Sequence, residues 1–319
     1  MIMVNLYWKS KDQIKDVEQK PFVNESDFEK YIYLNQTILG GDIYIIHRQI
    51  RSGAKEGIPD MLGVDQDSRI CIVEIKNEEA TEDILPQALQ YSIWAETNPD
   101  SIKALWLESK EKPEGINIDW DNIDIRIILI APSFKQNVLK MSRKIGYPVE
   151  LFQIRRYAID ENEFISVEVL EEEEKKIVST KATRDWDWEY YEKEHGIEST
   201  NQFKKLVELI DAYVKKQKWI IPYNINKYYT GFKSGNRVIF SVGWGSTYLW
   251  HIRFKIPEKY AKEYKGINWE FQRYDNSFNE AIFKFKGTSE LSIDELDSLF
   301  KLAYEGSSGK LKNLTPAST

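Results

Sequence analysis

Residues 57–76 read GIPDMLGVDQDSRICIVEIK, and this stretch decides the expected fold. Two short runs rich in apolar and β-branched residues flank the turn-forming letters DQDS, so the stretch predicts two consecutive strands. Each run carries an acid. The alternation of a strand places Asp60 on an apolar face, and it brings Glu74 and Lys76 together on one face. Because a buried carboxylate is costly without a partner, we expect something to compensate Asp60.

A shared cation is one such partner. If the two strands are neighbours, Asp60, Glu74 and the carbonyl of Ile75 converge on a single site, and this all-oxygen set suits Mg²⁺ or Mn²⁺. Lys76 would then lie beside the bound water. The competing interpretation is that Asp60 begins a turn and that Glu74 and Lys76 form an exposed ion pair, worth less than about 1 kcal/mol.

The surrounding sequence predicts an αβββαβ order. Its elements are a helix at 26–39, strands at 42–50, 57–64 and 69–76, a helix at 83–96 and a strand at 123–131. The last of these is nearly continuously apolar, as expected of a strand buried on both faces. A helix at 135–144 and strands at 148–158 and 164–170 follow. The first domain is therefore expected to be α/β, with a mixed sheet flanked by helices.

The composition bounds the class of protein. A chain of 319 residues with 42% hydrophobic residues has room for two domains with real cores. The lone cysteine, Cys71, excludes an internal disulfide and a cysteine-rich zinc site. No segment approaches the length of a membrane span, and residues 1–13 become charged too early for a signal peptide. We expect a cytoplasmic protein that does not associate with membranes.

The motif resembles that of the PD-(D/E)xK nuclease superfamily, whose core has the αβββαβ order of the restriction-endonuclease-like fold. Pro59-Asp60 is followed after thirteen residues by Glu74-Ile75-Lys76, and the next helix carries Gln87-Ala88-Leu89-Gln90-Tyr91. The last run resembles the Q-x-x-x-Y motif of the RecB-like and NucS-like branches. Gln87 and Tyr91 lie one helical turn apart, so both can face one site. The resemblance covers roughly residues 24–160.

The resemblance implies a role for each matched position. Asp60 and Glu74 would bind metal, Lys76 would orient the attacking water or stabilise charge on the phosphate, and Gln87 and Tyr91 would contact the substrate or order the site. The resemblance implies a metal-dependent nuclease, expected to be an endonuclease, that hydrolyses DNA phosphodiester bonds with a metal-activated water. A homodimer is compatible with this activity, because one active site cuts one strand.

Other charged residues near the motif have two interpretations. Glu29, in the first helix, either completes the site or folds back in a capping box on Ser26. Arg48, Arg51 and Lys55 precede Asp60 in the chain, where a loop could reach a phosphodiester backbone, but solvated loop charges are the plainer explanation.

The second half of the chain differs in charge. Residues 1–178 carry 22 Lys and Arg against 33 Asp and Glu, whereas residues 179–319 carry 22 against 18. We expect a nuclease-like domain at 1–178, a linker at 179–195 and a smaller, aromatic-rich α+β domain at 196–319 with a disordered tail. Its aromatic residues either stack unpaired bases or form a packed core. The alternative function is a catalytically silent module that binds nucleic acid or protein.

Overall fold

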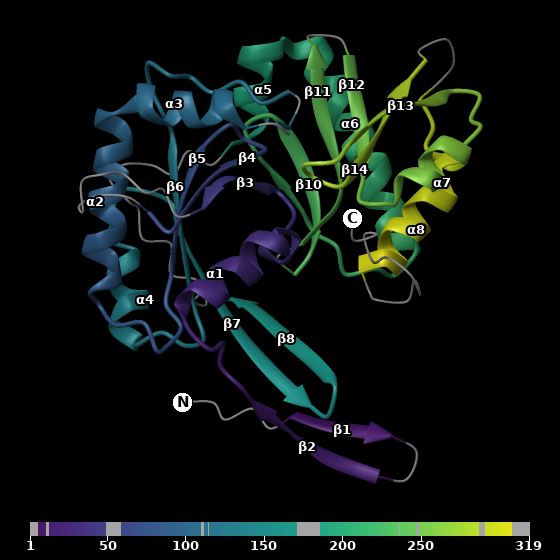
Figure 1. The fold of residues 1–319 in the computed structure, drawn as a ribbon. Helices are drawn as coiled ribbons and strands as arrows, with labels where there is room; N and C mark the ends of the chain where they lie inside the picture. Colours follow the sequence, from purple (N-terminus) through teal and green to yellow (C-terminus); the bar gives the residue numbers. More distant parts are fainter. Residues whose placement is uncertain are drawn as a thin grey trace. The chain divides into compact units, whose positions relative to one another are not determined.

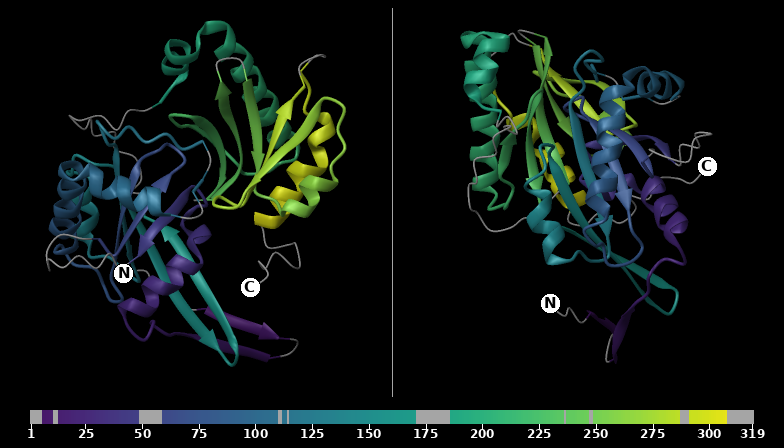
Figure 2. Two further views of the ribbon diagram at one scale, coloured as in Figure 1. Left: turned by 45° about the horizontal axis from the view of Figure 1, so that its top comes forward. Right: turned by 90° about the vertical axis from the view of Figure 1, so that its left-hand side faces the viewer.

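The computed structural model describes residues 6–10, 13–48, 59–109, 112–113, 115–170, 186–235, 237–246, 249–286 and 291–307. The chain forms two compact units. The first comprises Met1–Ile38, Ile45–Lys110 and Ile118–Thr183, and the second comprises Leu39–Tyr44, Glu111–Asn117 and Arg184–Thr319. Figures 1 and 2 show both units as ribbons.

A mixed sheet forms the frame of the first unit. Its strands, in the part of the chain that the structure describes, are β1 (Leu6–Ser10), β2 (Gln13–Gln19), β3 (Ile43–Arg48), β4 (Met61–Asp65), β5 (Ile70–Ile75), β6 (Ile125–Ala131), β7 (Val149–Ile159) and β8 (Asn162–Val169). They lie in the order β1-β2-β7-β6-β5-β4-β3, and β8 pairs with β7. The central strands β5, β6 and β7 are parallel, whereas β4 is antiparallel to β5. The expected mixed sheet is confirmed.

Helices flank this sheet. They are α1 (Glu25–Leu34), the 3₁₀ turn η1 (Gln36–Leu39), α2 (Ile84–Thr97), α3 (Pro99–Glu108) and α4 (Gln136–Ser142). α2 packs on β5 and β6, and α1 packs on β5. Figure 1 shows α2 and α4 on one side of β6 and α1 on the other. Every residue of β5 and β6 is buried, which explains their nearly unbroken apolar sequences.

Two elements of the first unit were not expected from the sequence. α3 follows α2 directly and begins at Pro99, where proline costs no helical hydrogen bond. The β1–β2 hairpin joins the sheet through residues near the end of β7, where Glu18 pairs with Ala158. Figure 1 shows the long β7–β8 hairpin extending out to β1 and β2. The hairpin strands are largely polar and exposed, so they lack the apolar alternation that reveals a strand.

The prediction of a strand at 57–64 is wrong in its boundaries. β4 begins at Met61, and Asp60 lies in a bend just before it. Asp60 therefore has no place in the alternation of the strand. The hydrogen bonds of its own side chain determine its orientation instead, as described below.

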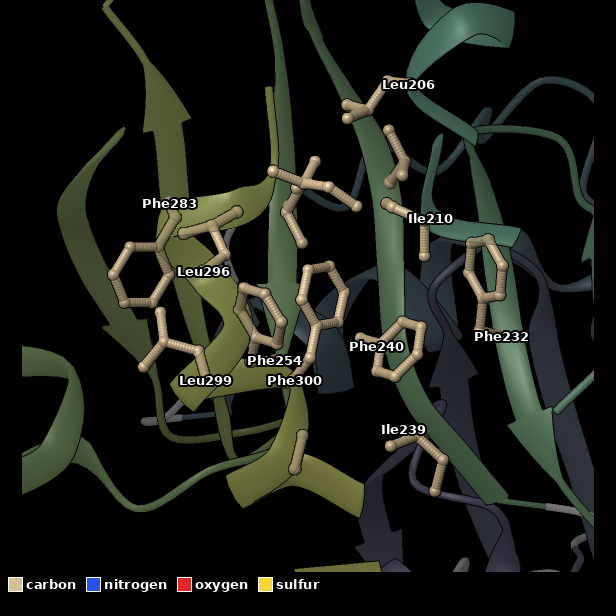
Figure 3. Close-up of a cluster of buried hydrophobic side chains, with 14 of the residues drawn as sticks. Leu206, Ile210, Phe232, Ile239, Phe240, Phe254, Phe283, Leu296, Leu299 and Phe300 are labelled. Atoms are coloured by element: carbon tan, nitrogen blue, oxygen red, sulfur yellow. The ribbon is translucent and has the colours of Figure 1, made fainter. Parts of the chain in front are cut away.

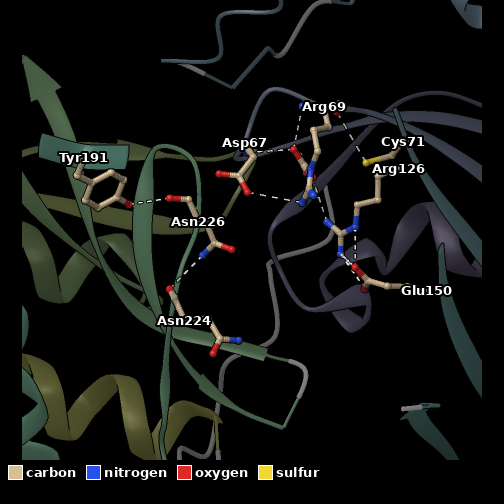
Figure 4. Close-up of polar contacts among 9 residues, drawn as sticks. Asp67, Arg69, Cys71, Arg126, Glu150, Tyr191, Asn224 and Asn226 are labelled. Atoms are coloured by element: carbon tan, nitrogen blue, oxygen red, sulfur yellow. Dashed lines mark hydrogen bonds and ion pairs between the residues drawn. The ribbon is translucent and has the colours of Figure 1, made fainter. Parts of the chain in front are cut away.

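A buried ion network holds the far end of β5. Arg126 in β6 contacts Glu150 in β7 through two hydrogen bonds of 2.9 and 2.8 Å, and its Nη1 donates to Asp65 at 3.2 Å (Figure 4). Arg69 also donates to Asp65, at 2.7 Å, and lies 3.6 Å from Asp67. The network ties the β4–β5 turn to the parallel strands, at the opposite end of β5 from Glu74.

The second unit is built on an antiparallel sheet. Its described strands are β9 (Tyr223–Ile225), β10 (Tyr229–Ser234), β11 (Arg237–Ser246), β12 (Leu249–Phe254), β13 (Trp269–Asp275) and β14 (Glu280–Phe285), in the order β13-β14-β12-β11-β10-β9. Its helices are α5 (Trp188–His195), α6 (Ile197–Lys216), α7 (Glu258–Glu263), η2 (Asp294–Leu296) and α8 (Asp297–Ser307). α6 and α8 pack on β11. The expected α+β class is confirmed.

Nine aromatic residues of the described chain are buried in the core of the second unit. The ring of Phe300 meets those of Phe240 and Phe254 edge-on, with centroids 5.0 and 4.9 Å apart (Figure 3). Trp269 is fully buried as well. The packed-core interpretation of these residues is therefore correct.

The segment expected to link the domains contains α5. Residues 171–185 and the tail at 308–319 lie outside the described residues. α5 packs on α6, and Tyr191 is fully buried in the core of the second unit. Its hydroxyl donates a 2.7 Å hydrogen bond to the carbonyl of Asn226 (Figure 4). Among the helices of the described chain, none combines the length and the apolar character needed to cross a membrane.

Candidate metal centre

Two hydrogen bonds hold Asp60 against the end of β5. The backbone N–H of Asp60 donates to Oε1 of Glu74 at 3.2 Å, and the N–H of Ile75 donates to Oδ2 of Asp60 at 2.8 Å. The pairing of β4 with β5, in which Met61 lies opposite Val73, provides the register for this contact. The two acids lie side by side as the sequence predicts.

Glu74 is the most deeply buried acid of the group. Its side chain has no exposed surface, and its Oε2 has no hydrogen-bond partner among the described residues. Burial raises the pKa of Glu74 to about 9, and the negative charge of Asp60 adds to this shift. Burial also raises the pKa of Asp60, although the hydrogen bond from Ile75 and the charge of Lys76 oppose it. The ionised pair is therefore poorly compensated by the protein alone.

Lys76 faces the same group of acids. Its Nζ lies 3.4 Å from Oε1 of Glu25 in α1. Burial alone would lower the pKa of Lys76, but the charges of Glu25, Asp60 and Glu74 outweigh it and raise the pKa above its ordinary value. Lys76 therefore stays positively charged.

α1 adds two carboxylates that face Asp60. Oxygen atoms of Glu25, Glu29 and Asp60 all lie within 4.8 Å of one another. Glu25 was missed in the sequence, although it stands four residues before Glu29, on the same helical face.

The capping-box interpretation of Glu29 is wrong. The N-cap of α1 is Asn24, whose Oδ1 accepts a 2.9 Å hydrogen bond from the N–H of Asp27. Ser26 therefore lies inside the helix, so Glu29 has no capping position to return to. Its side chain is buried beside Asp60 instead.

α2 brings Gln87 and Tyr91 to the site. Nε2 of Gln87 donates a 3.0 Å hydrogen bond to the hydroxyl of Tyr91. Burial raises the pKa of Tyr91, and the charges of Glu74 and Asp60 raise it further, so the ring lies within electrostatic range of both acids. The one-turn spacing read from the sequence is thus realised in the structure.

Of the three basic residues expected before Asp60, Arg48 is described and Arg51 and Lys55 lie outside the described residues. Nη1 of Arg48 is 3.4 Å from the carbonyl oxygen of Ser26, in the first turn of α1. The guanidinium therefore lies beside the helix that carries Glu25 and Glu29.

The donor set fits a hard divalent cation. The buried Oε2 of Glu74 has no hydrogen-bond partner among the described residues, and a buried carboxylate oxygen needs a proton, a cation or a donor. The N–H of Ile75 faces Asp60, and because the N–H and C=O of one strand residue point to the same neighbour, the Ile75 carbonyl is directed to that side too. All of these ligands are oxygens, the class that Mg²⁺ and Mn²⁺ prefer.

Comparisons with known proteins add little detail. No protein-family model matches the chain. An uncharacterized protein of Haemophilus influenzae is 20% identical over 245 residues, which cover 74% of this chain and 78% of that protein.

Three solved structures resemble part of the chain. They are EndoMS in complex with double-stranded DNA (21% identity, TM-score 0.29, 42% of this chain and 46% of that chain), a repair endonuclease from Pyrococcus abyssi (23%, 0.27, 41% and 48%) and EndoMS in its apo form (20%, 0.25, 43% and 48%). The chain spans less than half the length of each. At TM-scores this far below 0.5, these likenesses decide neither the fold nor the function.

Proposed function

We propose that this protein is a divalent-metal-dependent nuclease that hydrolyses DNA phosphodiester bonds. The observation that carries the proposal is the position of Glu74, a fully buried acid with an unpartnered oxygen, between Asp60 and Lys76. A merely structural acid in such a place would be paired or replaced by an apolar residue. An exposed same-face ion pair, the competing interpretation, does not agree with this burial.

The cation we propose is Mg²⁺ or Mn²⁺, held by Asp60, Glu74 and the carbonyl of Ile75. When bound, such a cation stabilises charge on a phosphate oxygen and makes water more acidic. Glu25 and Glu29 provide further oxygens around Asp60. Their negative charges favour cation binding and repel a substrate phosphate until that charge is neutralised.

The remaining side chains have roles that follow from their charge and position. Lys76 keeps its proton among three acids, so it can orient water through its N–H donors or stabilise negative charge that builds on the phosphate. Gln87 and Tyr91 form a hydrogen-bonded pair at the edge of the same site and can donate to a substrate oxygen. Arg48, whose guanidinium lies beside the first turn of α1, is a cation that can meet a neighbouring phosphate.

DNA is the substrate we propose, and cleavage within a strand is the expected reaction. The resemblance of the motif to that of DNA nucleases and the position of the Arg48 guanidinium beside α1 support this choice. The named structural neighbours include a repair endonuclease and a complex with double-stranded DNA, so duplex DNA belongs among the substrates to test.

The test is cleavage of labelled linear, circular, single-stranded and branched DNA with Mg²⁺ or Mn²⁺ and with EDTA. Wild-type protein should cut at least one substrate only with metal, and Glu74→Ala should cut none. The matched control is Glu79→Ala, an exposed acid five residues away, which should behave as wild type. Metal-independent cutting, or equal rates for wild type and Glu74→Ala, would contradict the proposal.

If no substrate is cut, calorimetry with Mn²⁺ separates the remaining explanations. Binding that Glu74→Ala abolishes would leave the metal centre intact and point to a substrate outside the panel. No metal binding at all would favour the catalytically silent binding module.

A further inference from the structure

A second feature of the first unit lies on the other side of α1 from the carboxylates. A pocket of about 300 Å³ opens between this helix, the segment before it and the β7–β8 hairpin. Its apolar lining comes from Phe22, Val23, Tyr31 and Leu34. None of these residues belongs to the candidate metal centre. The volume is at the lower end of the range for small-molecule and cofactor sites.

Three of the residues that line the pocket, Phe22, Tyr31 and Arg156, carry flat groups. The ring of Phe22 stacks on that of Phe28, with centroids 4.4 Å apart and planes at 11°, and it lies 5.2 Å from the ring of Tyr31. The guanidinium carbon of Arg156 lies 5.5 Å from the centroid of Phe22. Because Phe28 and Arg156 already lie against the ring of Phe22, the flat groups left for a nucleobase are the ring of Tyr31 and the guanidinium of Arg156.

The rim of the pocket has no net charge. Asp27 and Glu163 contribute two carboxylates, and Lys30 and Arg156 contribute two cations. Arg156 pairs with Glu163 across the hairpin. The carboxylates oppose a phosphate inside the pocket, whereas their acceptor oxygens suit the amino and ring N–H groups of a base. A flat, uncharged and polar ligand therefore fits best.

The helix itself relates the pocket to the metal centre. At 3.6 residues per turn, Asp27, Tyr31 and Leu34 lie roughly opposite Glu25 and Glu29 around α1. The solvent face between them carries Lys30, an exposed cation that lines the pocket rim. A helix is about 10–12 Å across, so a single strand that crosses this face links the two sites within a few nucleotides.

We propose that this pocket holds an unpaired nucleobase of the strand whose phosphate lies at the carboxylates of α1. The inference rests on the proposed nuclease function and names a feature of its substrate, a single-stranded segment next to the cut. The base would lie against the ring of Tyr31 and the guanidinium of Arg156, and the backbone would follow Lys30 around the helix.

Binding can be measured without cleavage. With Ca²⁺ in place of Mg²⁺ or Mn²⁺, so that a hard cation neutralises the carboxylates, fluorescence anisotropy of labelled (dT)₁₅ should show that Tyr31→Ala weakens binding at least about fivefold, because stacking of each base on an aromatic ring is a major part of such affinity. Tyr31→Phe keeps the ring and should bind within about twofold of wild type. Leu34→Ala, at a position that is 67% exposed, provides a second lining variant with little risk to the fold.

The matched control is Tyr7→Ala, because Tyr7 is 57% exposed on β1 and lies outside the pocket lining. It should bind (dT)₁₅ as wild type does. Wild type should bind an abasic oligomer of the same length more weakly than it binds (dT)₁₅. Tyr31→Ala should bind this abasic oligomer as well as wild type does. An oligouridylate arm identifies whether deoxyribose or ribose strands are the source of the base.

Three results would overturn the inference. They are no binding of any single strand by wild type, equal affinity of wild type and Tyr31→Ala for (dT)₁₅, and equal affinity of wild type for abasic and base-carrying strands. The proposed nuclease function fails separately, by the absence of metal-dependent cutting. A protein that cuts DNA yet ignores Tyr31→Ala refutes only the pocket, and one that binds through Tyr31 without cutting refutes only the nuclease.

Discussion

Asp60 and Glu74 hold each other in place through the backbone. The N–H of Asp60 donates to Glu74 at 3.2 Å, and the Asp60 carboxylate accepts from the residue after Glu74 at 2.8 Å. Each acid thus orients the strand segment that carries the other. The arrangement leaves one oxygen of Glu74 buried and, in the part of the chain that the structure describes, without a hydrogen-bond partner, and several of the following predictions test this property.

Glu74→Gln should abolish binding of Mn²⁺ while the fold persists. Glutamine keeps the shape and the acceptor for the N–H of Asp60, but it lacks the charge that a hard cation requires. Calorimetry and circular dichroism measure the two properties. Glu79→Gln, at an exposed position, should bind as wild type does. Unchanged Mn²⁺ affinity in Glu74→Gln would rule Glu74 out as a ligand.

The stability of the metal-free protein should fall as the pH rises from about 5 to about 9. The folded protein keeps the proton of Glu74 up to a pKa of about 9, whereas the unfolded chain loses it near its ordinary value of 4.5. The folded state therefore binds more protons in this window, and the free energy of unfolding decreases with pH. Thermal unfolding in EDTA at pH 5, 7 and 9 measures the slope. Glu74→Gln should flatten it, and a slope equal to that of wild type would contradict the assignment.

Binding of the cation should strengthen over the same pH range. A cation at Glu74 must displace the proton, so its binding releases protons and becomes tighter as the pH rises. Calorimetry in two buffers of different ionisation enthalpy measures the proton release. A Mn²⁺ affinity that does not change between pH 6 and pH 8 would refute the coupling.

Lys76→Ala should lower the rate of cleavage by about 10²–10³, the usual effect of removing one donor that stabilises transition-state charge. Mn²⁺ binding should persist, because the lysine ammonium is not a metal ligand and its removal leaves the carboxylates that hold the cation unchanged. Single-turnover cleavage and calorimetry give the two quantities. Loss of metal binding together with activity would indicate that Lys76 maintains the structure of the site instead.

Asn24→Ala should lower the free energy of unfolding by about 1 kcal/mol, because it removes the N-cap of α1. Ser26→Ala, two residues later and inside the helix, should have an effect of less than about 0.5 kcal/mol. Urea unfolding monitored by circular dichroism compares the two. The reverse order of effects would restore the capping box on Ser26.

Arg126→Met should destabilise the first unit by about 1.5–3 kcal/mol, since it removes charged hydrogen bonds to Asp65 and Glu150 while Arg69 still pairs with Asp65. The exposed pair of Lys15 and Asp160 serves as the control, and Lys15→Ala should change stability by less than about 1 kcal/mol. Urea unfolding measures both. Equal effects would mean that the buried network contributes no more than a surface ion pair.

Much of the candidate site could be read from the sequence because its members are close in the chain. Glu74 lies in β5, Asp60 just before β4 and Lys76 just after β5, so all three stand at or beside two neighbouring strands joined by a short turn, and Gln87 and Tyr91 follow on the next helix. Local periodicity is enough to bring such residues together. Their catalytic roles stay predictions.

The place of Glu25 in the site could not be predicted from local sequence patterns. It lies 51 residues from Lys76 in the chain, and no local pattern signals that Nζ and Oε1 come within 3.4 Å. The pocket beside α1 could not be predicted locally either, because its lining combines Tyr31 and Arg156, which come from distant segments.

The sequence by itself determined the mixed α/β class of the first unit, the α+β class of the second and the residues that form the acidic motif. These follow from apolar periodicity and from the cost of burying an acid, both of which are local properties. Only the tertiary structure decided that Asp60 precedes its strand, that the carboxylate of Glu29 lies beside that of Asp60, and that the β1–β2 hairpin completes the sheet. These depend on contacts between segments far apart in the chain, whose partners no single segment encodes.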